Sequence, residues 1–265
     1  MPRRWADPRA AKAVAPATRI RGRAAWLGAG LASGLIAVAV IGIVLLIGSS
    51  NSRAGGETRI DHEVSALLAG IPQEGRTLGS RMAPVTLQVF ADLEDNDSKR
   101  WVLTLLPAII DDFVRRGILK VEYRSYKTNT IHPETFVKQQ AAAVAAGAQD
   151  KLWNFVYIFY YEQGVEYTPY VTEHYIDNIA SQIPELNIAQ WHKDRNDGRR
   201  SEQVVTDDQT ARADGIHTSP AYRLGRTGGT LKNVVGSEAI TFPRQHHPTT
   251  FASVQDIAKA IKEIH

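Results

Sequence analysis

Four side chains that could do chemistry lie close together in the segment ADLEDNDSKRW. Glu94, Asp95 and Asp97 carry carboxylates, and Ser98 carries a hydroxyl. Such a group of oxygens could bind a hard cation such as calcium, which takes roughly six to eight oxygen ligands in a defined geometry. The segment spells no known calcium loop, whereas Asp, Asn and Ser are the residue types that cap helix N-termini. We therefore interpret residues 95–98 as a helix cap and predict no metal site.

Other routes to catalysis are few. The adjacent residues His246 and His247 suggest a transition-metal site, but no partner stands at ligand spacing, so we interpret them as a solvated loop. The chain has no cysteine, which excludes disulfides and thiol catalysis within it. A triad of serine, histidine and aspartate is defined in space, and residue order alone identifies none.

The acidic segment lies between a predicted strand and a predicted helix. Val85–Phe90 is an apolar, β-branched run typical of a core strand. Apolar residues then recur every three or four positions from about Asp97 to Arg116, which predicts a helix kinked at Pro107 and ended by Gly117. Residues 118–126 alternate and predict a second strand, parallel to the first through a right-handed crossover.

The rest of the chain predicts several helices and then a hairpin. An Ala-rich helix follows His132-Pro133, a second covers residues 151–163, and two or three more fit between residues 169 and 213. Residues 222–225 and 231–235 predict an antiparallel hairpin, and residues 253–264 predict a final amphipathic helix. A shorter helical pattern at residues 61–71 predicts a segment that packs on the domain or rests near a membrane surface.

Three parts of the chain resemble one family. APVTLQVFADLE, followed four residues later by KRW, resembles the active-site segment of DsbA-like thiol-disulfide oxidoreductases of the thioredoxin superfamily. The order HPETF, LWNF, YYEQG and AQW resembles their helical insertion, and residues 217–222 stand where the family has a cis-proline loop. This resemblance implies an α/β, thioredoxin-like fold over residues 72–265, with a DsbA-type helical insertion at about 132–214.

The family's two cysteines, in a Cys-x-x-Cys motif, occupy the positions held here by Asp95 and Ser98. Thiol-disulfide exchange needs a thiolate, which neither side chain supplies. The resemblance therefore implies a fold without redox activity and without a cofactor. We expect a protein-binding or structural module whose partner is an envelope or membrane protein. Its predicted peptide contacts are Asp95, Ser98, Trp101, Ser219 and Pro220.

An enzyme with non-thiol chemistry in the same cleft is the alternative. Kappa-class glutathione transferases are relatives of this fold that use a serine at the active-site turn to activate glutathione, and Ser98 suggests this alternative. In those enzymes the serine opens the turn, whereas Asp95 stands there in this chain and would repel a thiolate.

The N-terminal part predicts a membrane anchor. Residues 24–48 are 25 positions without a charge, and as a helix they would span about 37 Å, more than the ~30 Å hydrocarbon core. Residues 1–23 carry seven cations and one anion, so the positive-inside rule predicts a cytoplasmic N-terminus and an extracytoplasmic domain. Ala54-Gly55-Gly56 leaves a cleaved signal peptide as the alternative. Residues 49–71 are then a linker with the short helix.

The basic character of the chain comes from this tail alone. The tail has a net charge of +6 and the whole chain has +3, so residues 24–265 have a net charge of −3. A mildly acidic domain gives no basis for a nucleic-acid partner, and we predict none.

Overall fold

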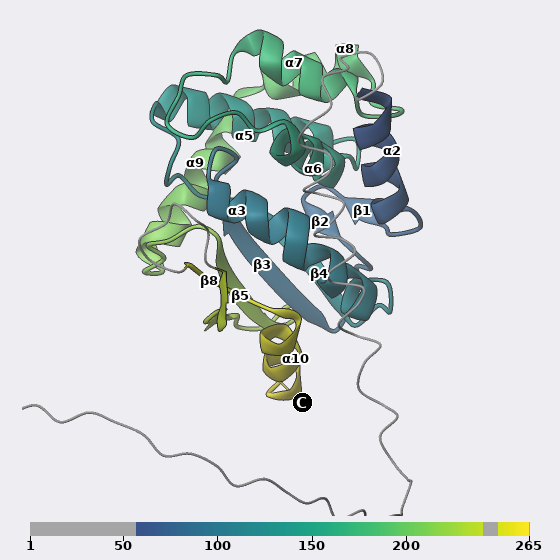
Figure 1. Ribbon diagram of the computed structural model, residues 1–265, viewed down its shortest axis with the longest axis vertical. Helices are drawn as coiled ribbons and strands as arrows, with labels where there is room; N and C mark the ends of the chain where they lie inside the picture. The colour runs from purple at the N-terminus through teal and green to yellow at the C-terminus, as the bar shows by residue number, and fades with distance from the viewer. Residues whose placement is uncertain (1–56, 241–248, 265) are drawn as a thin grey trace, which may run out of the picture. The chain divides into compact units, whose positions relative to one another are not determined.

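The computed structural model describes residues 57–240 and 249–264 (Figure 1). The predicted tail, the predicted transmembrane helix at residues 24–48 and the His246-His247 pair lie outside these residues. Among the described helices, none is both long enough and apolar enough to cross a membrane.

A six-stranded sheet forms the centre of the domain, with the strand order β1-β2-β4-β3-β5-β6. β3 pairs parallel with β4, as predicted for the first two strands, and antiparallel with β5. The three strands therefore belong to one sheet. The strands are β1 (Gln73–Glu74), β2 (Thr77–Leu78), β3 (Val85–Ala91), β4 (Leu119–Ser125), β5 (Ala221–Arg226) and β6 (Lys232–Val234).

The helical run after β3 packs on one face of the sheet, in front of β3 and β4 in Figure 1. It comprises α3 (Asn96–Arg100), the π-helical turn η1 (Trp101–Leu105), α4 (Leu106–Ile109) and a second π-helical turn, η2 (Ile110–Val114). We predicted a single α-helix with a kink at Pro107. The structure instead has π-helical turns before and after the short α4 that contains this proline, which removes one backbone donor and crowds the preceding turn.

The helical insertion consists of α5 (Pro133–Gly147), α6 (Leu152–Glu162), α7 (Glu173–Ser181), α8 (Ile188–Arg195) and α9 (Gly198–Ala213). Residues 152–160 of α6 are all buried, because α2 and α5 pack beside this helix. A helix that is apolar around its circumference is typical of a core position. Between residues 169 and 213, where we predicted two or three helices, the structure has three: α7, α8 and α9.

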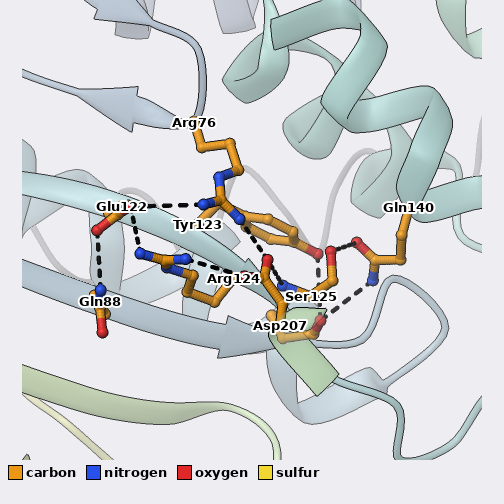
Figure 2. Close-up of polar contacts among 9 residues, drawn as sticks. Arg76, Gln88, Glu122, Tyr123, Arg124, Ser125, Gln140 and Asp207 are labelled. Atoms are coloured by element: carbon orange, nitrogen blue, oxygen red, sulfur yellow. Dashed lines mark hydrogen bonds and ion pairs between the residues drawn. The ribbon is translucent and has the colours of Figure 1, made fainter. Parts of the chain in front are cut away.

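Asp207 of α9 fastens the insertion to the sheet (Figure 2). Its carboxylate accepts hydrogen bonds from Arg76 Nη1 at 2.5 Å, from Arg124 Nη1 at 3.0 Å and from the Ser125 backbone N–H at 3.2 Å. Glu122 of β4 also pairs with both arginines, at 3.8 Å and 2.7 Å. The Asp207 side chain is 4% exposed, so its charge depends on these partners.

The remaining elements close the domain. α2 (Glu57–Leu68) packs on α6 through the buried side chains of Val64 and Leu68, the first of the two predicted positions for this segment. β7 (Glu238–Ile240) and β8 (Thr249–Phe251) form a small separate sheet that we did not predict. α10 (Val254–Lys262) begins with a capping box between Ser253 and Asp256 and buries Ile257 and Ile261.

Candidate functional site

The turn after β3 is built around Asp95, which is the N-cap of α3 as predicted. Its backbone is extended, and its carboxylate accepts hydrogen bonds from the backbone N–H groups of Asp97 at 3.1 Å and Ser98 at 2.9 Å. These bonds satisfy two of the free donors at the helix N-terminus. The short acidic segment therefore has a structural role that its composition predicted.

Ser98 joins this turn to the loop before β5. The Ser98 hydroxyl donates to Asp95 Oδ2 at 2.7 Å, and its oxygen lies 2.7 Å from Ser219 Oγ. The Ser219–Pro220 peptide bond is cis, as the resemblance implies. β3 and β5 are antiparallel neighbours with Phe90 opposite Ala221. The C-terminal end of β3 and the N-terminal end of β5 therefore lie side by side.

A second set of contacts, which the sequence did not indicate, holds Asp95 from the opposite side. Asn129 Nδ2 donates to Asp95 Oδ1 at 2.9 Å and to Glu166 Oε1 at 2.5 Å. Glu166 also accepts from the Asn96 backbone N–H at 3.2 Å and from Asn96 Nδ2 at 3.0 Å. The loops after β4 and after α6 are thus tied to the turn.

Asp92, at the end of β3, shapes the loop after β4. Its Oδ2 accepts hydrogen bonds at 2.9 Å from three consecutive backbone N–H groups, those of residues 128–130. Its Oδ1 accepts from the Thr130 hydroxyl and from the Glu94 N–H. We did not predict this role, because the donors in the loop after β4 lie 36 to 38 residues away in the chain.

These segments enclose a pocket of about 450 Å³, here called the Asp95 pocket. It is open on one side to solvent, where His217 and Thr218 are exposed. The lining residues are Asp95, Asp97, Thr128, Asn129, His217, Thr218, Ser219, Pro220 and Thr250.

Two of the five predicted peptide contacts are buried and do not line the Asp95 pocket. Trp101 is completely buried, donates from Nε1 to the Ala252 carbonyl at 2.9 Å and packs against the Tyr222 ring, so a peptide in the pocket would not touch it. Ser98 is also completely buried and does not line the pocket. It holds Asp95 and Ser219 instead. Asp95, Ser219 and Pro220 do line the pocket.

Two buried carboxyl groups at the site, those of Asp95 and Glu94, have raised pKa values. Burial raises the pKa of Asp95 to about 7, against the hydrogen bonds from Ser98 and the Asp97 N–H, which lower it. Burial, and then the neighbouring charge of Asp92, raises the pKa of Glu94 to about 7. Glu94 is 3% exposed, and its Oε1 has no hydrogen-bond partner among the described residues. Within the same residues, no group of three or more acidic, histidine or cysteine side chains could hold a metal ion.

Comparison with known proteins identifies the family of the chain. The sequence model of the thioredoxin family matches residues 72–227, which include both the Asp95 turn and the cis-proline loop. The chain belongs to the thioredoxin family, and its described domain has a DsbA-like fold. This DsbA-like domain lacks cysteine, so the turn that carries Asp95 and Ser98 contains no thiol.

Relatives of this DsbA-like domain include the probable disulfide bond formation protein D of Bacillus anthracis. The two are 24% identical over 166 residues, which cover 60% of this chain and 71% of the relative. Among solved structures, the domain is similar to oxidised BdbD from Bacillus subtilis, with a TM-score of 0.56 and 17% identity over 73% of this chain and 96% of the other. It is also similar to alpha-DsbA1 from Wolbachia pipientis, with a TM-score of 0.52 and 13% identity over 74% and 91% of the two chains.

Proposed function

We propose that this chain is a redox-inactive, DsbA-like module that is anchored in the cell membrane by residues 24–48 and binds a protein partner in the cell envelope. The observation that carries the proposal is the Asp95 turn. A carboxylate and a hydroxyl, hydrogen-bonded to each other at 2.7 Å, stand where the chemistry of the family needs two sulfur atoms.

The loop opposite the turn supports the binding role. Ser219 and the cis-bonded Pro220 border an open pocket of about 450 Å³, together with the exposed residues Thr218 and His217. Backbone beside such a loop suits an extended peptide, which gains main-chain hydrogen bonds there. A segment of an envelope protein is the occupant that this arrangement suits.

The proposed location follows from the N-terminal sequence. The apolar span of residues 24–48 is long enough to cross a bilayer, and the basic residues before it favour a cytoplasmic N-terminus. Residues 57–264 would then lie outside the cytoplasm. Protease protection of a C-terminal tag in intact cells and in opened cells tests this orientation.

Redox inactivity is tested with the full-length chain in mild detergent. We expect no turnover in insulin reduction or in dithiol oxidation, because the turn has no nucleophilic sulfur. Clear turnover would contradict the proposal. A glutathione titration followed by tryptophan fluorescence distinguishes the alternative, since saturable binding would favour a glutathione-dependent enzyme over a protein-binding module.

Binding is tested by photo-crosslinking in native membranes. A photoreactive amino acid at position 217 lies on the rim of the Asp95 pocket, and one at position 82 replaces Met82, which is 88% exposed and does not line this pocket. We expect one protein adduct from position 217 and none from position 82. Equal adducts from both positions, or none from either, would contradict a dedicated binding surface.

A further inference from the structure

A directed chain of hydrogen bonds runs from the backbone of Asp92 to the carboxylate of Asp95. The Asp92 N–H donates to Ser219 Oγ at 3.2 Å. The Ser98 hydroxyl has a single proton, which it donates to Asp95 Oδ2, so at the 2.7 Å contact with Ser219 it accepts. The Ser219 proton therefore points inward, toward Ser98, and not into the Asp95 pocket.

The direction of this chain depends on the charge of Asp95. As a carboxylate, Asp95 can only accept, and four donors converge on it: two backbone N–H groups, the Ser98 hydroxyl and the Asn129 amide. A proton on Oδ2 makes that oxygen a donor facing the Ser98 hydroxyl. The least disruptive response is for Ser98 to accept from Asp95 and to donate to Ser219.

We propose that protonation of Asp95 reverses the two hydroxyl links of this chain, between Asp95 and Ser98 and between Ser98 and Ser219, and turns the Ser219 O–H into the Asp95 pocket. Ser219 would then accept from both Ser98 and the Asp92 N–H. Its own proton would no longer have an acceptor within this chain of hydrogen bonds. The Ser219 hydroxyl donates to Ser98 in the ionised state and would donate into the pocket, beside cis-Pro220, in the protonated state. A carbonyl oxygen of an extended peptide is the group that such a donor would bind.

The surroundings of Asp95 make protonation accessible near neutral pH. The carboxyl group is 2% exposed, and burial raises its pKa to about 7. The titratable and charged groups around it come from every neighbouring segment. They are Asp92, Glu94, Asp97 and Arg100 on the turn and α3, Lys127 after β4, Tyr160 on α6, Glu166 and Tyr167 after α6, and His217 and Tyr222 around β5.

Binding of a peptide carbonyl by the Ser219 hydroxyl rests on the proposed function. The reversal of the hydrogen bonds between Asp95, Ser98 and Ser219 does not require any ligand. The test therefore uses the full-length chain alone, in mild detergent, labelled with ¹³C and ¹⁵N aspartate. The Asp95 carboxyl resonance reports ionisation, and the Asp92 amide resonance reports the hydrogen bond to Ser219. A background of Glu94→Gln and His217→Gln removes a neighbouring carboxyl group and a neighbouring imidazole, so that the two resonances report on Asp95.

We expect the Asp92 amide to titrate with the same midpoint as the Asp95 carboxyl, about pH 7. With Ser98→Ala added, the Asp95 midpoint is expected to rise because the charged form loses a donor, and the Asp92 amide to stop following it. Asp95→Asn is the second variant, in which the Asp92 amide should stay constant over the same range. An amide that does not follow Asp95, or that still follows it after Ser98→Ala, would overturn the proposal. If both resonances titrate together but the photoreactive residue at position 217 forms no adduct in native membranes, the proposed function is contradicted and the reversal is left in place.

Discussion

The side-chain oxygens of Ser98 and Ser219 lie 2.7 Å apart, although 121 residues separate them in the chain. The chain between them passes through the helical run to β4, β4 itself and the helical insertion. The contact joins the N-terminal turn of α3 to the cis-proline loop and fixes one wall of the Asp95 pocket. Substitutions at and around this contact therefore test both the chemistry and the stability of the site.

Introducing cysteines at positions 95 and 98 should give the chain thiol-disulfide exchange activity. Asp95→Cys combined with Ser98→Cys places a thiol under the N–H groups of residues 97 and 98, which now bind the Asp95 carboxylate and would stabilise a thiolate. We expect insulin reduction about tenfold or more above that of Ser98→Cys alone, which lacks the attacking thiol. A folded double variant with no turnover would show that the surroundings no longer support exchange.

Removing the helix cap should destabilise the domain. Asp95→Ala leaves the N–H groups of Asp97 and Ser98 without their acceptor and is expected to lower the free energy of unfolding by about 1–2 kcal/mol. Asp97→Ala is the matched control, since this partly exposed carboxylate pairs with Arg100 on the surface and is worth less than about 1 kcal/mol. Urea denaturation measures both, and equal losses would argue against Asp95 as the cap.

Loss of the buried carboxylate that fastens the insertion should be more severe. Asp207→Ala removes the more buried of the two carboxylates that Arg76 and Arg124 share, leaves only Glu122, and is expected to cost about 3–5 kcal/mol. Glu185→Ala removes an exposed pair with Lys151 and should change stability by less than about 1 kcal/mol. A loss below about 1 kcal/mol for Asp207→Ala would show that Glu122 alone compensates the two arginines.

The buried Glu94 should make the domain less stable as pH rises. Its pKa is raised from 4.5 to about 7, so between these values the folded state binds more protons than the unfolded state, and the free energy of unfolding falls with increasing pH. Glu94→Gln removes this dependence. We expect the variant to gain about 2–3 kcal/mol relative to the natural chain between about pH 5 and about pH 8, measured by urea denaturation. A stability difference that stays constant over this range would contradict a buried, protonated Glu94.

Local patterns in the sequence were enough to predict the elements around the site. The apolar run at residues 85–90 became β3, and the preference of Asp for helix caps identified Asp95. The cis bond at Pro220 came from the resemblance and not from any local pattern. The β7–β8 hairpin was missed because its strands are only three residues long and leave little periodicity to detect.

The side chains that contact the Asp95 turn from distant loops could not be predicted in the same way. Asn129 and Glu166 reach Asp95 and Asn96 from loops 34 and 70 residues away, and nothing in their own neighbourhoods points to the turn. Trp101 shows the opposite problem. Helical spacing placed it near the turn, but periodicity does not say which face of a helix meets a groove and which meets the core, and the structure assigns Trp101 to the core.

The Asp92 carboxylate, which binds three successive backbone N–H groups of the loop after β4, has a consequence for how such a site can change. The frame around positions 95 and 98 is held by an anion that is neither of them. The loop after β4 therefore keeps this anchor whichever side chains stand at positions 95 and 98.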